Sequence, residues 1–315
     1  MSLRSRILPL FSLTVASTVL ATSVSAQDGD RSSDHKVGLR EHRPNVWALQ
    51  HARVVVNSER TLGDATVVVR NGLIESVEKG GAVPVDARVI DVRGKTVYPG
   101  FIDAYSEVSL STDGIQQAAK YWNPNVVPQL SVADQFVANS QNKDLRRQGF
   151  VAQLRAPSGK IIRGQSALVS TGATDPNVAV LVADVAQHLQ QTPASRSRDV
   201  YPNSPMGAVA LCRQAMYDAN WYRDAWKAAD ADASLPRPER NDALAALQPV
   251  INDTQPVIIE TSNELFVLRA NRFAGEFGLN LIVKGNGYEY RRLKEIAATQ
   301  RPLILPLNFS KAPNV

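Results

Sequence analysis

The sequence is poor in the residues that build disulfides and imidazole sites. Its 315 residues include one cysteine, Cys212, and four histidines. A single cysteine excludes a disulfide within the chain, so stability must come from packing of the hydrophobic residues, which make up 44% of the sequence. We expect Cys212 to be a small buried hydrophobe, not a nucleophile, in a helix that begins near Ser204 and Pro205.

Clusters of one charge are also missing. The formal net charge is +5, and basic residues such as Arg53, Arg70 and Arg88 are scattered through a region of strand-like composition. Aromatic residues make up only 6% of the chain and do not gather beside these arginines. A nucleic-acid interface needs a basic patch, commonly with stacking aromatics, so we expect no nucleic-acid partner.

Long apolar runs are confined to the N-terminus. Arg4 and Arg6 precede an apolar run over residues 7–20, and small residues at 24–26 follow as a cleavage site. The run is shorter than the ~20 residues of a spanning helix, which disfavours an uncleaved anchor. Residues 1–26 are therefore predicted to be a signal peptide. The protein should be exported, periplasmic or secreted, and not integral to a membrane after the signal is removed.

The rest of the chain divides into three parts by composition and by the periodicity of its apolar residues. Residues 27–45 are polar and aperiodic, which predicts a flexible leader. Residues 46–97 consist of short β-branched runs, and Asn71-Gly72 predicts a tight type I′ hairpin between two of them. Residues 98–315 alternate strand-like and helix-like segments, which favours an α/β fold.

The clearest alternation lies near the C-terminus. Strands are predicted over 256–260, 280–284 and 302–307, and helices over 264–277 and 288–300, with Gly278 ending the first helix. Strands spaced in this way call for parallel pairing with right-handed crossovers. The middle region predicts strands over 149–155, 167–170 and 178–182, then a helix-rich insertion over 205–229.

The segment Pro99-Gly100-Phe101-Ile102-Asp103 follows the strand-rich unit directly. It resembles the junction of the amidohydrolase superfamily, particularly its imidazolonepropionase-related, metal-dependent members. The resemblance covers most of residues 47–310. It also rests on the segments at 52–56, 67–74, 90–91, 94–95, 149–152, 156–165 and 256–306.

This resemblance implies a small N-terminal β-sandwich, the composite domain, over residues 46–97. A (β/α)₈ TIM-like barrel would occupy residues 98–315. It further implies hydrolysis of carbon–nitrogen bonds other than peptide bonds, of the cyclic amide type, with divalent metal held at the barrel mouth. A barrel takes roughly 250 residues, more than follow Asp103, so we expect it to be incomplete. A C-terminal complementing chain is then a possible partner.

The metal ligands of the family are altered here. Tyr105 and Glu107 stand where the resembled proteins carry two histidines on the first barrel strand, and Glu260 replaces a third. Lys284 precedes a glycine-flanked turn where some members have another histidine. A phenol with a pKa near 10 binds zinc poorly, whereas carboxylates suit Mn or Mg.

The four histidines of the chain lie elsewhere, at positions 35, 42, 51 and 188, and His188 is expected on a helix surface. The usual imidazole site therefore cannot be assembled.

Three hypotheses for the function remain open. In the first, the chain is an amidohydrolase with an atypical carboxylate site on Glu107 and Glu260, which would hold zinc, Mn or Mg. Alternatively, it is a non-catalytic binding protein whose pocket of Tyr105, Glu107, Glu260 and Lys284 takes a small-molecule ligand and no metal. As a third possibility, it is the N-terminal part of a longer or split amidohydrolase.

Overall fold

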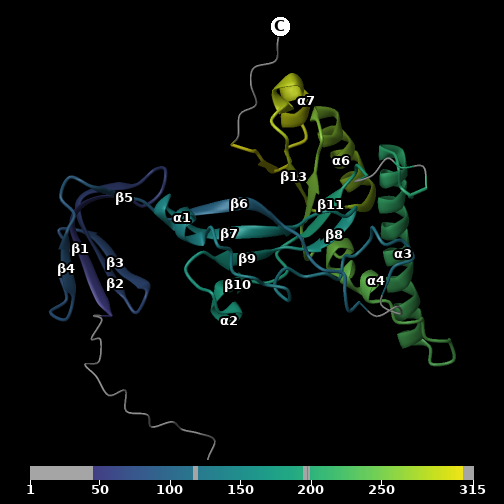
Figure 1. Cartoon of the computed structure of the whole chain (residues 1–315), viewed down its shortest axis with the longest axis horizontal. Helices are drawn as coiled ribbons and strands as arrows, with labels where there is room; N and C mark the ends of the chain where they lie inside the picture. The colour runs from purple at the N-terminus through teal and green to yellow at the C-terminus, as the bar shows by residue number, and fades with distance from the viewer. Residues whose placement is uncertain (1–44, 116–119, 194–196, 198, 308–315) are drawn as a thin grey trace, which may run out of the picture. The chain divides into compact units, whose positions relative to one another are not determined.

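The computed structural model describes residues 45–115, 120–193, 197 and 199–307 (Figure 1). The predicted signal peptide and nearly all of the predicted leader lie outside these residues. Contacts divide the described chain into two compact units, one of residues 45–54 and 60–97 and the other of residues 55–59 and 98–307. In these ranges, the helices are all too short or too polar to cross a membrane.

The first unit is a single five-stranded sheet in the order β3-β2-β1-β4, with β5 also paired to β1. Its strands are β1 (Val46–Val55), β2 (Thr61–Arg70), β3 (Leu73–Lys79), β4 (Arg88–Asp91) and β5 (Thr96–Val97). The expected two-sheet sandwich is thus one sheet here. Residues 47–50 of β1 pair with β4 and residues 53–54 pair with β5, so one long strand serves both partners.

The turn between β2 and β3 has the predicted conformation. Asn71 and Gly72 have φ angles of 52° and 81°, both in the left-handed region that a type I′ turn requires. The antiparallel pairing of Arg70 with Leu73 follows directly from this turn. The hairpin prediction is therefore confirmed.

The second unit contains two mixed sheets. One has the order β10-β9-β7-β6 and is formed by β6 (Phe101–Val108), β7 (Phe150–Pro157), β9 (Ala167–Ser170) and β10 (Val180–Val182). Strands β6 and β7 are parallel, whereas β9 is antiparallel to both of its neighbours. The segment predicted as a strand over 178–182 begins instead with the short helix α2 (Pro176–Ala179).

The other sheet has the order β14-β13-β12-β11-β8. Its strands are β8 (Ile162–Gln165), β11 (Gln187–Gln190), β12 (Val257–Glu260), β13 (Leu281–Lys284) and β14 (Leu303–Ile304). Strands β11 to β14 are parallel, as the alternation near the C-terminus predicts, but β8 is antiparallel to β11.

The predicted parallel pairing of the C-terminal strands is therefore confirmed, and the α/β class is right. The antiparallel pairs made by β8 and β9 are a departure from a (β/α)₈ barrel. Over the ranges described, the sheets do not close into a barrel: β6 pairs only with β7, and β14 only with β13.

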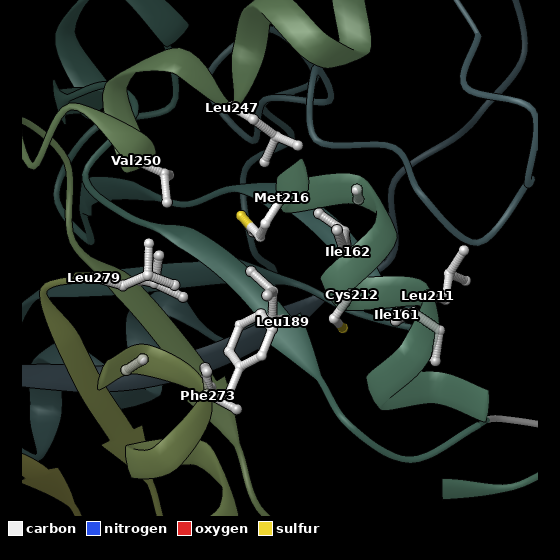
Figure 2. Close-up of a cluster of buried hydrophobic side chains, with 14 of the residues drawn as sticks. Ile161, Ile162, Leu189, Leu211, Cys212, Met216, Leu247, Val250, Phe273 and Leu279 are labelled. Atoms are coloured by element: carbon white, nitrogen blue, oxygen red, sulfur yellow. The ribbon is translucent and has the colours of Figure 1, made fainter. Parts of the chain in front are cut away.

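Helices cover one face of this second sheet (Figure 1). The covering helices are α3 (Pro205–Ala231), α4 (Asp242–Ala246), α5 (Gln248–Ile251) and α6 (Glu264–Phe277). Figure 2 shows Leu211, Cys212 and Met216 of α3 packed near Leu189 of β11 and Phe273 of α6. Cys212 is fully buried, as predicted, and burial raises the pKa of its thiol to about 12.

Local signals explain where α6 begins and ends. The Asn263 side chain accepts hydrogen bonds from the backbone N–H groups of Leu265 and Phe266, which caps the first turn. Gly278 ends the helix at a φ of 67°. The helix predicted over 288–300 is instead a 3₁₀ turn (Glu289–Arg292) and the short α7 (Leu293–Ala297). The remaining helix is α1 (Asn142–Arg147).

Gly164 in β8 lies where the backbone packs closely against Leu130. Its φ is +112°, and a Cβ atom on it would lie 2.4 Å from the carbonyl oxygen of Leu130. We expect Gly164→Ala to lower the free energy of unfolding by about 3 kcal/mol, because both conformation and space oppose a side chain. Urea unfolding followed by circular dichroism measures this change.

Gly275→Ala is the matched control, because Gly275 lies in α6 with no atom within 4 Å of the added Cβ. This substitution should stabilise the protein by up to about 1 kcal/mol. Equal destabilisation by the two substitutions would contradict the described packing.

Candidate functional site

The sequence-predicted site residues lie on three strands of the second unit, β6 of one sheet and β12 and β13 of the other. Tyr105 and Glu107 are alternate residues of β6 and approach a common partner from the same face of the strand. Glu260 ends β12 and Lys284 ends β13. Strands β12 and β13 are parallel, so their carboxyl ends lie side by side, and Glu260 is paired in register with Lys284.

The common partner is Arg163 of β8, which the sequence analysis did not identify. Its side chain is only 4% exposed. The Nη1 atom lies 3.4 Å from the Tyr105 hydroxyl, 3.4 Å from Glu107 Oε1 and 2.7 Å from Glu260 Oε2. A buried guanidinium is stable only when paired and hydrogen-bonded, and Arg163 meets both conditions.

The remaining donors of Arg163 hold the guanidinium in place. Nε donates to the carbonyl oxygen of Lys160 at 3.1 Å, and Nη2 donates to the Gln190 side-chain oxygen. Gln190 ends β11 and is paired in register with Glu260. We call this group the Arg163 cluster; it consists of Tyr105, Glu107, Arg163, Gln190, Glu260 and Lys284.

Two cations and two carboxylates balance the charge of the Arg163 cluster. Lys284 Nζ lies 3.6 Å from Glu260 Oε1, so Glu260 is shared between both cations. The same ammonium lies 5.2 Å from the centre of the Tyr105 ring, within range of a cation–π interaction. Burial raises the pKa of Tyr105 above its usual range, so its phenol stays protonated.

His188 adjoins the Arg163 cluster, which corrects its predicted place on a helix surface. It lies in the middle of β11, is 1% exposed, and its ring centre is 5.6 Å from that of Tyr105. Polar neighbours suggested an exposed helix, but β11 is flanked by β8 and β12 and its Gln187 is buried as well. Burial, and secondarily the charge of Arg163, lower the pKa of His188 to about 3, which keeps its imidazole neutral.

A sequence signal for Arg163 did exist. It stands in Ile161-Ile162-Arg163-Gly164, where the two isoleucines are fully buried in the core. An arginine in so apolar a run must find an acidic partner if the run is a buried strand. The signal was missed because the charged Arg163 interrupts the apolar run that would otherwise predict β8 as a strand.

The Arg163 cluster borders a cavity of about 670 Å³. Tyr105, Glu107 and Lys284 line one part of the cavity and apolar side chains line another, including Ile102, Leu303, Leu305 and Leu307. Glu107 is 48% exposed and contacts Arg163 at 3.4 Å, so its carboxylate is accessible to a molecule in this cavity.

One solved structure has a fold similar to that of the chain. An amidohydrolase from Thermotoga maritima MSB8 matches with a TM-score of 0.71 and 20% identity, covering 85% of this chain and 72% of that one. The fold is similar to that of an amidohydrolase. At this identity the likeness extends to the fold alone.

Two further solved structures match more weakly. One is an amidohydrolase with a TM-score of 0.40, 16% identity, and coverage of 83% of this chain and 66% of that chain. The other is a D-hydantoinase with a TM-score of 0.32, 12% identity, and coverage of 76% and 57%. No protein-family model and no curated protein matches the sequence.

The residues at the strand ends do not fit the divalent metal that the sequence resemblance implies. Tyr105, Glu107 and Glu260 converge on Arg163 Nη1, so a cationic nitrogen stands among the oxygens that a metal would need. Elsewhere in the described chain, no three His, Cys, Asp or Glu side chains are grouped so that they could hold a metal ion.

The buried imidazole of His188 should make the protein sensitive to acid. Its folded pKa of about 3 lies below the ~6.5 of an unfolded histidine, so the unfolded state takes up a proton first as the pH falls. Between pH 6.5 and 4 this should lower the free energy of unfolding by up to about 1.4 kcal/mol per pH unit. His188→Phe should remove that contribution, as measured by urea unfolding at pH 7, 5.5 and 4.5.

His51→Phe serves as the control, because His51 belongs to the first unit. Tryptophan fluorescence reports the second unit through Trp122, Trp221 and Trp226. An acid dependence in His188→Phe as steep as that in His51→Phe would contradict the placement of His188.

Proposed function

We propose that this protein belongs by descent to the amidohydrolase superfamily, and that its strand-end pocket binds a small molecule without metal-dependent hydrolysis. One observation carries the proposal: a charge-balanced Arg163 cluster borders a cavity of about 670 Å³. A volume in the range of 300–1,000 Å³ with apolar walls and a few convergent polar groups is typical of small-molecule sites.

The lining of the cavity favours a ligand with an apolar body and a cationic end. Glu260 is held by Arg163 at 2.7 Å and by Lys284 at 3.6 Å, so its charge is already balanced. Glu107 is the carboxylate with the weaker contact and the greater exposure. An ammonium or amidinium group would pair with it, while Ile102 and Leu305 contact the apolar body.

A metal-dependent hydrolase of non-peptide carbon–nitrogen bonds is the second candidate, supported by the amidohydrolase-like fold and by the two carboxylates. It requires Arg163 to withdraw so that Glu107 and Glu260 can bind zinc, Mn or Mg. Turnover of a cyclic amide panel in the presence of MnCl₂, abolished by Glu260→Gln, would favour this candidate. Absence of turnover at saturating manganese would remove it.

A completing polypeptide is a partner that we also propose. Its support is that β6 and β14 each have one paired edge in the described chain, with Phe101 and Leu305 exposed beside them. Amides of β14 should exchange hydrogen rapidly in the isolated chain. Co-expression with the polypeptide encoded directly downstream should slow that exchange, and unchanged exchange would count against this partner.

Export remains a proposal drawn from residues 1–26, whose composition is that of a signal peptide. Expression of the full chain in a bacterial host should yield a mature protein that begins near Gln27, as read by N-terminal sequencing of the periplasmic fraction. An intact N-terminus would contradict export by this route.

The ligand class can be tested with a matched pair of probes, hexylamine and hexanoate, which share a chain length and differ in charge. Hexylamine should bind saturably to the purified protein in calorimetric titration, and hexanoate should bind at least tenfold more weakly. Glu107→Gln should weaken hexylamine binding at least tenfold, because it removes the accessible negative charge.

Glu295→Gln is the control for this experiment. Glu295 is 50% exposed and lies 3.4 Å from Arg292, nearly the same exposure and ion-pair distance as Glu107, but it is on α7 and does not line the cavity. Hexylamine affinity should be unchanged in this variant. Equal binding of both probes, or no binding of hexylamine, would overturn the proposed ligand class.

A further inference from the structure

The guanidinium of Arg163 stands at the point where oxygen atoms from two sheets converge. Tyr105 and Glu107 come from β6, and Glu260 comes from β12 of the other sheet. All three direct an oxygen at the same nitrogen, Nη1, at 3.4, 3.4 and 2.7 Å. A cation surrounded by a phenolic oxygen and two carboxylates is the arrangement of a metal centre, with nitrogen in place of the metal.

We infer that Arg163 is a built-in cation that fills this centre and prevents divalent metal from binding there. The inference rests on the proposed function, in which the site works without metal. A metal ion at the same point would be repelled by the fixed positive charge of Arg163, whose side chain is only 4% exposed. Of the two carboxylates, Glu260 already faces a cation at each of its oxygens.

Arg163 cannot simply swing away to admit a metal. Its Nε is held by the Lys160 carbonyl oxygen and its Nη2 by Gln190. The backbone beside it is fixed as well, because Gly164 packs against Leu130 so closely that no Cβ would fit, and Ile162 is fully buried. Displacing the guanidinium would leave a buried charge without its partners.

A second cation reinforces the exclusion of metal. Lys284 Nζ lies 3.6 Å from Glu260 Oε1, the oxygen that Arg163 does not contact. Both oxygens of Glu260 therefore face a cation, and neither is free for a metal ion. Removing Arg163 alone should nevertheless expose one oxygen each of Glu107 and Glu260 at a common point.

The inference predicts a gain of metal affinity on removal of the guanidinium. Arg163→Gln should bind Mn²⁺ at least tenfold more tightly than the unmodified protein, as read from free Mn²⁺ by electron paramagnetic resonance. Arg163→Lys keeps the charge and should not gain affinity. The double variant Arg163→Gln with Glu260→Gln should lose the gain.

Arg155→Gln is the matched control for loss of a buried arginine. Arg155 lies on β7 in the same unit, is 9% exposed, and its Nη1 donates to the carbonyl oxygen of Val137; within the described chain no carboxylate is hydrogen-bonded to it. It should leave Mn²⁺ affinity unchanged. A gain in Arg155→Gln equal to that in Arg163→Gln would overturn the inference, as would a folded Arg163→Gln without any gain.

The unmodified protein provides a test that does not depend on the folding of Arg163→Gln. MnCl₂ should not raise its thermal unfolding midpoint, because the centre is filled. A rise that Glu107→Gln and Glu260→Gln each abolish would overturn the inference. Hexylamine titration of the same samples tests the proposed function separately. Hexylamine can fail to bind while Mn²⁺ is still excluded, and Mn²⁺ can bind while hexylamine still binds.

Discussion

The site depends on one buried charge, the guanidinium of Arg163. It belongs to β8 at the edge of one sheet, reaches Tyr105 and Glu107 on β6 of the other sheet, and meets Glu260 on β12. Burying such a group is costly unless every donor is used. Contacts with Arg163 therefore link the strands that carry Tyr105, Glu107 and Glu260. Of these residues, Tyr105 and Glu107 also line the cavity.

The fold of the chain and the chemical groups at its candidate site lead to different expectations. The fold is similar to that of a solved amidohydrolase, with a TM-score of 0.71. The centre at the strand ends nevertheless holds a protein cation among phenol and carboxylate oxygens, beside a neutral imidazole at His188. Fold similarity alone does not establish activity, because activity depends on the groups presented at the site. Strands β6, β8, β12 and β13 position an ion-pair network here.

The sequence predicts those parts of the structure that local signals specify. The strand at β12, the capped helix α6 ending at Gly278 and the strand at β13 follow from apolar periodicity and turn residues. The proximity of Glu260 and Lys284 follows as well, because these residues end two adjacent parallel strands, β12 and β13. Arg163 and His188 could not be placed in this way, because the polar side chains buried in β8 and β11 interrupt the apolar pattern of a strand. Their partners are distant in sequence, so only the assembled sheets bring them together.

The central claim is that a guanidinium occupies the place of a metal ion. A crystal structure of the unmodified protein grown in millimolar MnCl₂, with diffraction recorded at the manganese absorption edge, tests it most directly. Arg163 should lie between Glu107 and Glu260, with no anomalous peak at their meeting point. An anomalous peak coordinated by both carboxylates, with Arg163 turned away, would contradict it.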